Sequence, residues 1–200
     1  MSAHAETAHH GAHPPEANQS SRVDSATLGM LLFIASEIML FGSFFTAYFF
    51  IRVNGNADWP LEPFHLPKFV AGVNTAILVT SSFTIHWALQ SIKRGSRIGL
   101  QAGLVLTLAL GTTFLLTQML EYARVGFSPA DGAFGTIFYG LTGLHGAHVF
   151  VGLTLLTFAT IRSFRGHFSP SHHHGVEIPG IYWHFVDVMW IVVYATIYLL

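Results

Sequence analysis

The 200-residue chain contains no cysteine. Disulfide bonds, thiolate metal sites, iron–sulfur clusters and covalent attachment of a c-type heme are therefore excluded from it. Charged residues are also scarce, at 10% of the sequence, against about 25% in an ordinary soluble domain. The formal net charge of −1 provides no basic surface, so we expect no nucleic-acid partner.

Hydrophobic residues make up 52% of the chain and gather in long runs. The hydrocarbon core of a bilayer, roughly 30 Å thick, requires about 20 apolar residues in helical form. The runs are too long for the strands of a membrane barrel, and they contain many of the small residues that let membrane helices pack closely. The predicted fold class is therefore all-α, a polytopic membrane bundle of five transmembrane helices. The expected helices cover about 25–51, 68–91, 98–121, 135–161 and 178–200.

Residues 1–21 form a polar tail that lacks the basic start and early apolar core of a secretory signal. We therefore expect the first apolar run to be retained as a helix, so that the membrane domain covers residues 22–200. Histidine recurs in the tail and between the fourth and fifth runs. We expect these histidines to be solvated and without a specific role, with weak metal binding or pH-dependent charge as the alternative. They are His4, His9, His10 and His13 in the tail and His172, His173 and His174 in the loop.

Lysine and arginine are distributed unequally between the two sides of the predicted bundle. An excess of these residues in short loops marks the cytoplasmic side of a membrane protein. The tail, the second loop and the fourth loop together hold six of them, and the opposite side holds three. Because the number of crossings is odd, we predict a cytoplasmic N-terminus and an external C-terminus. The six are Arg22, Lys93, Arg94, Arg97, Arg162 and Arg165, and the three are Arg52, Lys68 and Arg124.

Glu37 lies near the middle of the first apolar run. A charged side chain at that depth is unfavourable by roughly 3 kcal/mol or more, so Glu37 should face the bundle and be largely protonated. We expect it to reach a polar group on another helix, with His148 the first choice and the hydroxyls of Thr75, Thr80 or Thr142 next. The residues alone leave two interpretations open, a hydrogen-bonded packing residue and a group linked to proton movement.

Two further polar pairs lie within the apolar runs. His145 and His148 are three residues apart in the fourth run, and His184 and Asp187 are three apart in the fifth. Side chains at this spacing share one face of a helix, and a histidine–carboxylate pair can fix a tautomer or share a proton. Two ligands on one helix do not complete a metal site, so no metal is expected. A structural hydrogen-bond network is the favoured interpretation, with a proton-linked role as the alternative.

No nucleophile elbow, phosphate-binding loop or Cys–His pair is present, so no catalytic residue is predicted. Glu121 and Tyr122, at the end of the third run, and Glu177, at the start of the fifth, are expected to be interfacial caps and anchors. Trp59, Trp87, Tyr182 and Trp183 are expected to belong to an aromatic belt at the membrane surface. These features alone fit an oxidase accessory subunit, a small transporter or a component of a proton channel.

Five segments in a fixed order carry a specific resemblance over about residues 28–198. They resemble subunit III of the heme–copper oxidases, and specifically subunit III of the cytochrome c oxidases. The segments are Gly29-Met-Leu-Leu-Phe-Ile-Ala-Ser-Glu37, Val73-Asn-Thr-Ala-Ile77, Glu121-Tyr122 with Asp131-Gly132, Thr142-Gly-Leu-His-Gly-Ala-His-Val149, and Tyr182-Trp-His-Phe-Val-Asp-Val188 continuing into Met189-Trp190.

The resemblance implies a non-catalytic helical subunit that lies beside subunit I of the oxidase and supports its stability and proton uptake. It implies no heme or copper in this chain, because in that family subunit I carries the two hemes and one copper and subunit II docks the electron donor. Glu37 matches the family's intramembrane glutamate, and His148 matches the histidine suited to partner it. His184 and Asp187 match the pair in the last helix. A bacterial plasma membrane, or another energy-transducing membrane, is the expected location.

The chain departs from the longer members of the family, which have seven helices. It begins at the third of these and so resembles the short bacterial form with five helices. Half of the wall of the lipid-filled cleft found in longer members is then missing, although membrane lipids and a bound phospholipid are still expected.

Two alternatives remain, subunit III of a quinol oxidase and a stand-alone transporter. The transporter would need helices broken at mid-depth, whereas the five runs are predicted to be free of proline.

Overall fold

A computed structural model of the chain describes residues 24–55, 67–170 and 173–200. Within these residues five helices are long and apolar enough to cross a membrane. The chain is therefore a multi-pass membrane protein with the all-α fold predicted from its sequence. The predicted tail over 1–21, the loop over 56–66 and His172 lie outside the described residues. The helices are α1 (Ser25–Asn54), α2 (Lys68–Lys93), α3 (Arg97–Tyr122), α4 (Gly132–Phe164) and α5 (His174–Tyr194), which continues into the π-helical turn η1 (Ala195–Leu199).

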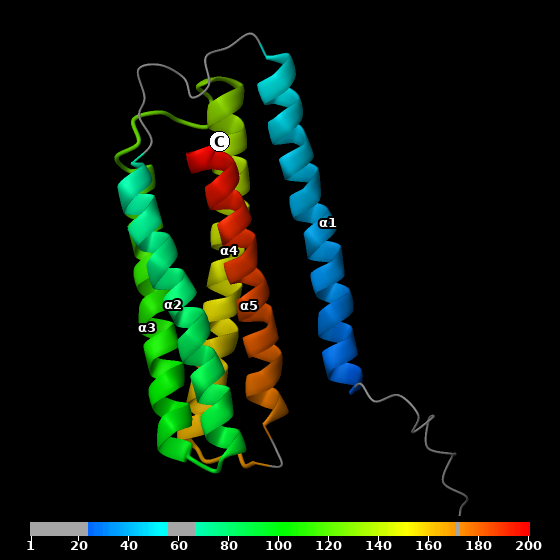
Figure 1. Cartoon of the computed structure of the whole chain (residues 1–200), viewed down its shortest axis with the longest axis vertical. Coiled ribbons are helices and arrows are strands. Elements are labelled where there is room, and N and C mark those ends of the chain that lie inside the picture. The colour runs from blue at the N-terminus through cyan, green and yellow to red at the C-terminus, as the bar shows by residue number, and fades with distance from the viewer. Residues whose placement is uncertain (1–23, 56–66, 171–172) are drawn as a thin grey trace, which may run out of the picture.

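Helices α2 to α5 form a compact bundle, and α1 lies along one side of it (Figure 1). Among the described residues, α1 packs mainly against α4 and α5, and Tyr48 near its end donates a hydrogen bond to Thr196 of η1. Phe41 and Tyr48 are its buried residues, whereas Leu32, Met39 and Phe50 expose most of their surface. Much of the apolar surface of α1 is therefore available to lipid or to other membrane proteins.

Local sequence explains where the helices begin. The carboxylate of Asp24 accepts a hydrogen bond from the N–H of Ala26 and caps α1. Ahead of α4, the N–H of Ser128 donates to Asp131 at 2.7 Å, and this bond lowers the pKa of the exposed Asp131 carboxyl. Gly132 then has a φ of +82°, which favours glycine over any residue with a Cβ. The Asp131-Gly132 pair thus sets the turn from which α4 starts.

The observed helices extend one to four residues beyond most of the predicted limits. Lys93 and Arg162 lie in the last turns of their helices, where long basic side chains can reach the membrane surface. The prediction that the runs are free of proline is wrong, because Pro179 lies inside α5. It is tolerated because α5 begins at His174, so the hydrogen bond lost to Pro179 is near the helix end and not at mid-depth.

Trp183 on α5 is fully buried and contacts three other helices. A Cβ added at Gly111 of α3 would lie 2.6 Å from its ring, and one at Gly152 of α4 would lie 2.8 Å from it. Its indole Nε1–H donates to Ser81 Oγ of α2 at 2.8 Å. The two glycines therefore form a slot that admits the indole ring, and the hydroxyl of Ser81 satisfies the polar atom that the ring carries inside.

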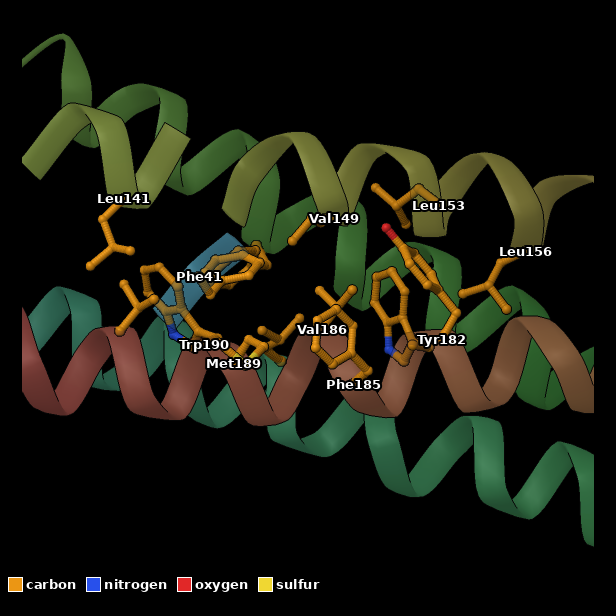
Figure 2. Close-up of a cluster of buried hydrophobic side chains, with 14 of the residues drawn as sticks. Phe41, Leu141, Val149, Leu153, Leu156, Tyr182, Phe185, Val186, Met189 and Trp190 are labelled. Carbon is orange, nitrogen blue, oxygen red and sulfur yellow. The ribbon is translucent and has the colours of Figure 1, made fainter. Parts of the chain in front are cut away.

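The expected position of Trp183 and Tyr182 in an interfacial aromatic belt is wrong. Both side chains lie within the bundle, with exposed fractions of 0% and 2%. Tyr182 belongs to a buried layer in which residues of α5 face residues of α4, with Phe41 of α1 beside them (Figure 2). Trp87 is 49% exposed, as a residue of such a belt should be.

The slot around Trp183 can be tested with Gly111→Ala. The added methyl group would overlap the indole ring, so we expect the variant to lose about 1–3 kcal/mol of stability, as overpacked cores do. Gly143→Ala is the matched control, because a Cβ at Gly143 would meet nothing within 4 Å. Thermal unfolding of the purified protein in detergent measures the difference, and equal stability of the two variants would contradict the slot.

Candidate functional site

The predicted contact between Glu37 and His148 is present in the structure. His148 Nε2 of α4 lies 2.9 Å from Glu37 Oε2 of α1. The side chains are 12% and 16% exposed, respectively. Since α1 has few other polar contacts with the bundle, this pair fixes the middle of α1 against α4.

The second ring nitrogen of His148 defines the chemistry of the pair. His148 Nδ1 lies 2.8 Å from the carbonyl oxygen of Leu144. A carbonyl oxygen only accepts hydrogen bonds, so Nδ1 must carry a proton. The contact between Nε2 and Oε2 then holds one further proton, on the carboxyl or on the imidazole. The pair can therefore exist as a neutral acid and base or as an ion pair without any change in its total charge.

Aromatic rings enclose the pair on the bundle side. The ring centroid of Phe41 lies 5.0 Å from that of His148, and the ring centroid of Phe185 lies 6.4 Å from it. The hydroxyl of Tyr182 donates to the main-chain oxygen of His148 at 3.3 Å. These groups exclude water from one side of the pair, which strengthens its hydrogen bond and disfavours a net charge.

His145 does not join this pair, although it is only one turn away on α4. It is fully buried, and its ring lies against those of Phe114 and Trp190, at centroid distances of 5.8 and 4.8 Å. Neither ring nitrogen has a hydrogen-bond partner among the described residues. Three residues along a helix leave two side chains about 60° apart around its axis, and α4 is placed so that this difference directs His148 to α1 and His145 to α3 and α5. The structure thus separates two histidines that the spacing had grouped together.

His184 and Asp187 are connected through Ser82 of α2, a residue that the sequence analysis did not indicate. The hydroxyl of Ser82 on α2 lies 3.0 Å from His184 Nδ1 and donates a hydrogen bond to Asp187 Oδ2. The predicted pair is therefore a triad across the contact between α2 and α5. Its third member could have been suspected only from the cluster of hydroxyl residues at Thr80, Ser81 and Ser82.

Glu121 is a buried residue and not the interfacial anchor that we expected. It is 4% exposed, and its Oε1 accepts a hydrogen bond from the hydroxyl of Tyr198 at 2.6 Å. The sequence could have indicated that Glu121 is buried, because the spacing from Phe114 to Gln118 to Glu121 places these three residues on one face of α3. In contrast, Tyr122 is half-buried and donates to Thr142 at 2.7 Å.

The described residues include no group of three or more His, Asp or Glu side chains placed to share a metal ion. The expectation that this chain holds no metal or heme remains a prediction. Each of the two polar clusters links a histidine and a carboxyl group at a helix–helix contact, directly in the first and through Ser82 in the second, and such an arrangement can hold and transfer protons. Within the described residues, the two clusters are hydrogen-bonded networks of ionisable and hydroxyl side chains on the membrane-spanning helices.

Comparison with known proteins identifies the family. A family model described as cytochrome c oxidase subunit III matches residues 3–200. The chain belongs to the cytochrome c oxidase subunit III family. It is 40% identical over 178 residues to cytochrome c oxidase subunit 3 of Thermostichus vulcanus, with 88% of each chain covered.

Animal members of the subunit III family match at similar identity. The protein from Pelomedusa subrufa is 38% identical over 203 residues, which cover 96% of this chain and 74% of the relative. That from Lumbricus terrestris is 42% identical over 180 residues, which cover 85% of this chain and 68% of the relative. The resemblance inferred from the five segments is confirmed, and in this chain Glu37 of the first segment lies against His148 of the fourth.

Two substitutions of Glu37 should separate its acidity from its packing. Glu37→Gln retains the shape, and its amide can donate to His148 Nε2, so we expect normal folding. Glu37→Leu leaves the imidazole without a partner, and we expect a loss of about 1–3 kcal/mol of stability. Thermal unfolding in detergent compares them, with Ser36→Ala as the control because the hydroxyl of Ser36 donates within its own helix. A stability of Glu37→Leu equal to that of Glu37→Gln would contradict the role of the contact.

Proposed function

We propose that this chain is an accessory subunit of a heme–copper oxidase, that it lies beside subunit I, and that its Glu37–His148 pair holds an exchangeable proton within the membrane. The observation that carries the proposal is the hydrogen bond of 2.9 Å between Glu37 and a histidine whose other nitrogen is occupied by a carbonyl. A pair that shares one proton can take up or release a proton with little structural change. Such a group supports proton supply to a neighbouring subunit, and its cross-helix bond also supports assembly.

The depth of the pair favours this role. Glu37 is 12 residues from the start of α1 and His148 is 16 residues from the end of α4, about 18 and 24 Å along the helices. Both distances correspond to the interior of a bilayer, where an ionisable group is costly and is retained for a function. The pair is also partly exposed at its outer edge, so a neighbouring subunit could receive the proton there.

The oxidase assignment is favoured over a stand-alone transporter. Each described helix is continuous through its span, and Pro179 lies near the end of α5. A transporter site of the known kind uses helices unwound at mid-depth. Exposed apolar surface along α1 also calls for protein neighbours or phospholipid. Subunits I and II are the proposed protein partners, and subunit II decides between cytochrome c and quinol as electron donor, since a two-copper site indicates cytochrome c.

The proposed location is the plasma membrane of a bacterium or another energy-transducing membrane. Lys93, Arg94 and Arg97 lie at the same end of the bundle as Arg162 and Arg165, which agrees with a cytoplasmic assignment of that end. We therefore expect that a reporter active only in the cytoplasm gives no signal when fused after Leu200. A strong signal would reverse the proposed orientation.

Purification from cells tests the proposed assembly. We expect the chain to isolate with two larger subunits and their hemes, and to show no heme absorbance once separated from them. Stoichiometric heme bound to the separated chain would refute the accessory role.

The proposed proton role is tested in the assembled oxidase. We expect Glu37→Gln to leave the heme content unchanged and to reduce proton uptake, or endurance during turnover. Heme spectra and the kinetics of pH change during oxygen reduction provide the two measurements, with Ser36→Ala as control. Unchanged proton uptake and unchanged endurance together would leave Glu37 a packing residue.

A further inference from the structure

A second polar path enters the bundle between α2 and α5, away from the Glu37–His148 pair. It begins at Glu177, in the first turn of α5. Glu177 Oε1 lies 3.3 Å from Lys93 Nζ at the end of α2. Its Oε2 lies 3.5 Å from His174 Nδ1 and 3.9 Å from His173 Nε2. A carboxylate among an ammonium and two imidazoles at the membrane surface can collect protons from solution.

A cavity continues inward from Glu177. It has a volume of about 160 Å³, and Glu177, His86, His184 and Gly180 are among its lining residues. Glu177 and His184 are seven residues apart on α5, so the cavity spans about 10 Å along the helix. A water molecule requires roughly 10–15 Å³ of such space and two to four polar partners. The cavity has room for several waters, and Glu177, His86 and His184 provide polar partners within a lining that is otherwise apolar.

The path ends at the triad of His184, Ser82 and Asp187. His184 Nδ1 faces the Ser82 hydroxyl at 3.0 Å, and this hydroxyl donates to Asp187 Oδ2. Asp187 is 3% exposed, and its Oδ1 has no hydrogen-bond partner among the described residues. Asp187 lies 13 residues inside α5, about 20 Å from the helix start. A carboxyl group at this depth therefore connects to the membrane surface through side chains and a cavity.

The other ionisable groups on the helices around α5 are engaged elsewhere. Glu37 of α1 is bound to His148 of α4. His145 of α4 lies between the rings of Phe114 and Trp190. On α2, the groups directed to this region are Ser82 in the triad and His86 in the cavity wall. Asp187 is therefore connected to the polar path between α2 and α5, and not to the Glu37–His148 pair.

We infer that Asp187 is a second proton-binding site, loaded from the membrane surface at Glu177 through the cavity, His184 and Ser82. The ligand is a proton, and each transfer conserves atoms and charge. Protonated His184 gives its Nδ1 proton to Ser82 Oγ while the Ser82 hydroxyl proton passes to Asp187 Oδ2. The products are neutral His184, an intact Ser82 hydroxyl and a protonated Asp187. Release follows the same steps in reverse, so the site acts as a reversible proton store.

Infrared spectroscopy of the purified oxidase complex tests this inference. A protonated carboxyl has a C=O stretching band that shifts when its proton is replaced by deuterium. We expect the native complex to have such a band that is lost in Asp187→Asn and retained in Glu37→Gln. After transfer into heavy water, we expect Ser82→Ala to slow deuteration of this band about 10²-fold, the lower end of what a positioned proton-transfer group contributes. Glu177→Gln should slow it as well.

Ser43→Ala is the matched control, because the hydroxyl of Ser43 donates to Leu40 within α1, and it should leave the deuteration rate unchanged. If Asp187→Asn does not assemble, Ser82→Ala itself assigns the band, since losing the hydrogen bond to Asp187 shifts its frequency. A native complex without an Asp187 band at any pH would overturn the inference. So would a deuteration rate that is the same in Ser82→Ala and in Ser43→Ala. Both outcomes leave the proposal for Glu37 intact, because that proposal is tested separately with Glu37→Gln.

Discussion

The bundle depends on the insertion of one large aromatic ring into a space that two glycines leave open. Trp183 brings α5 against α3 at Gly111 and against α4 at Gly152, and its Nε1 is satisfied by Ser81 of α2. Membrane helices gain little from hydrophobic burial against one another, because lipid tails are as apolar as the interior. Close packing and a few hydrogen bonds must therefore hold them, and Trp183 provides both. The adjacent residues Tyr182 and His184 take their orientations from this fixed point.

Helix number and helix type followed from the sequence because apolar run length and hydrogen-bond satisfaction in lipid leave few alternatives. The contact between Glu37 and His148 could also be predicted, because two polar groups at equal depth are strongly driven to meet. The start of α5 was less accessible, since the apolar run predicted a start at about residue 178 whereas the helix begins at His174. In membrane helices the ends extend beyond the apolar run, and composition does not mark where they stop.

The errors share a physical cause. Glu121 was assigned to the membrane surface by its place at the end of an apolar run and Trp183 by its residue type, whereas both are enclosed by partners far away in the sequence. The partners, Tyr198 and Ser81, are unremarkable in sequence and acquire their roles only when the helices assemble. Ser82 was missed for the same reason. A single sequence reveals which polar groups need satisfaction, but the helix that provides it depends on rotation angles that hydropathy does not encode.

The attachment of α1 has a mechanical consequence. This helix is held at Glu37 by His148 and, farther along, at Tyr48, whose hydroxyl donates to the carbonyl of Thr196 at 2.7 Å. The 12 residues from Ser25 to Ser36 extend beyond the first of these points and include no buried side chain. This segment touches the bundle only through apolar contacts among the described residues, with Phe33 against the ring of Tyr182 and Met30 and Ile34 against the core. Apolar contacts can slide, whereas a hydrogen bond is directional, so a neighbour that displaces this segment changes the geometry of the Glu37 bond.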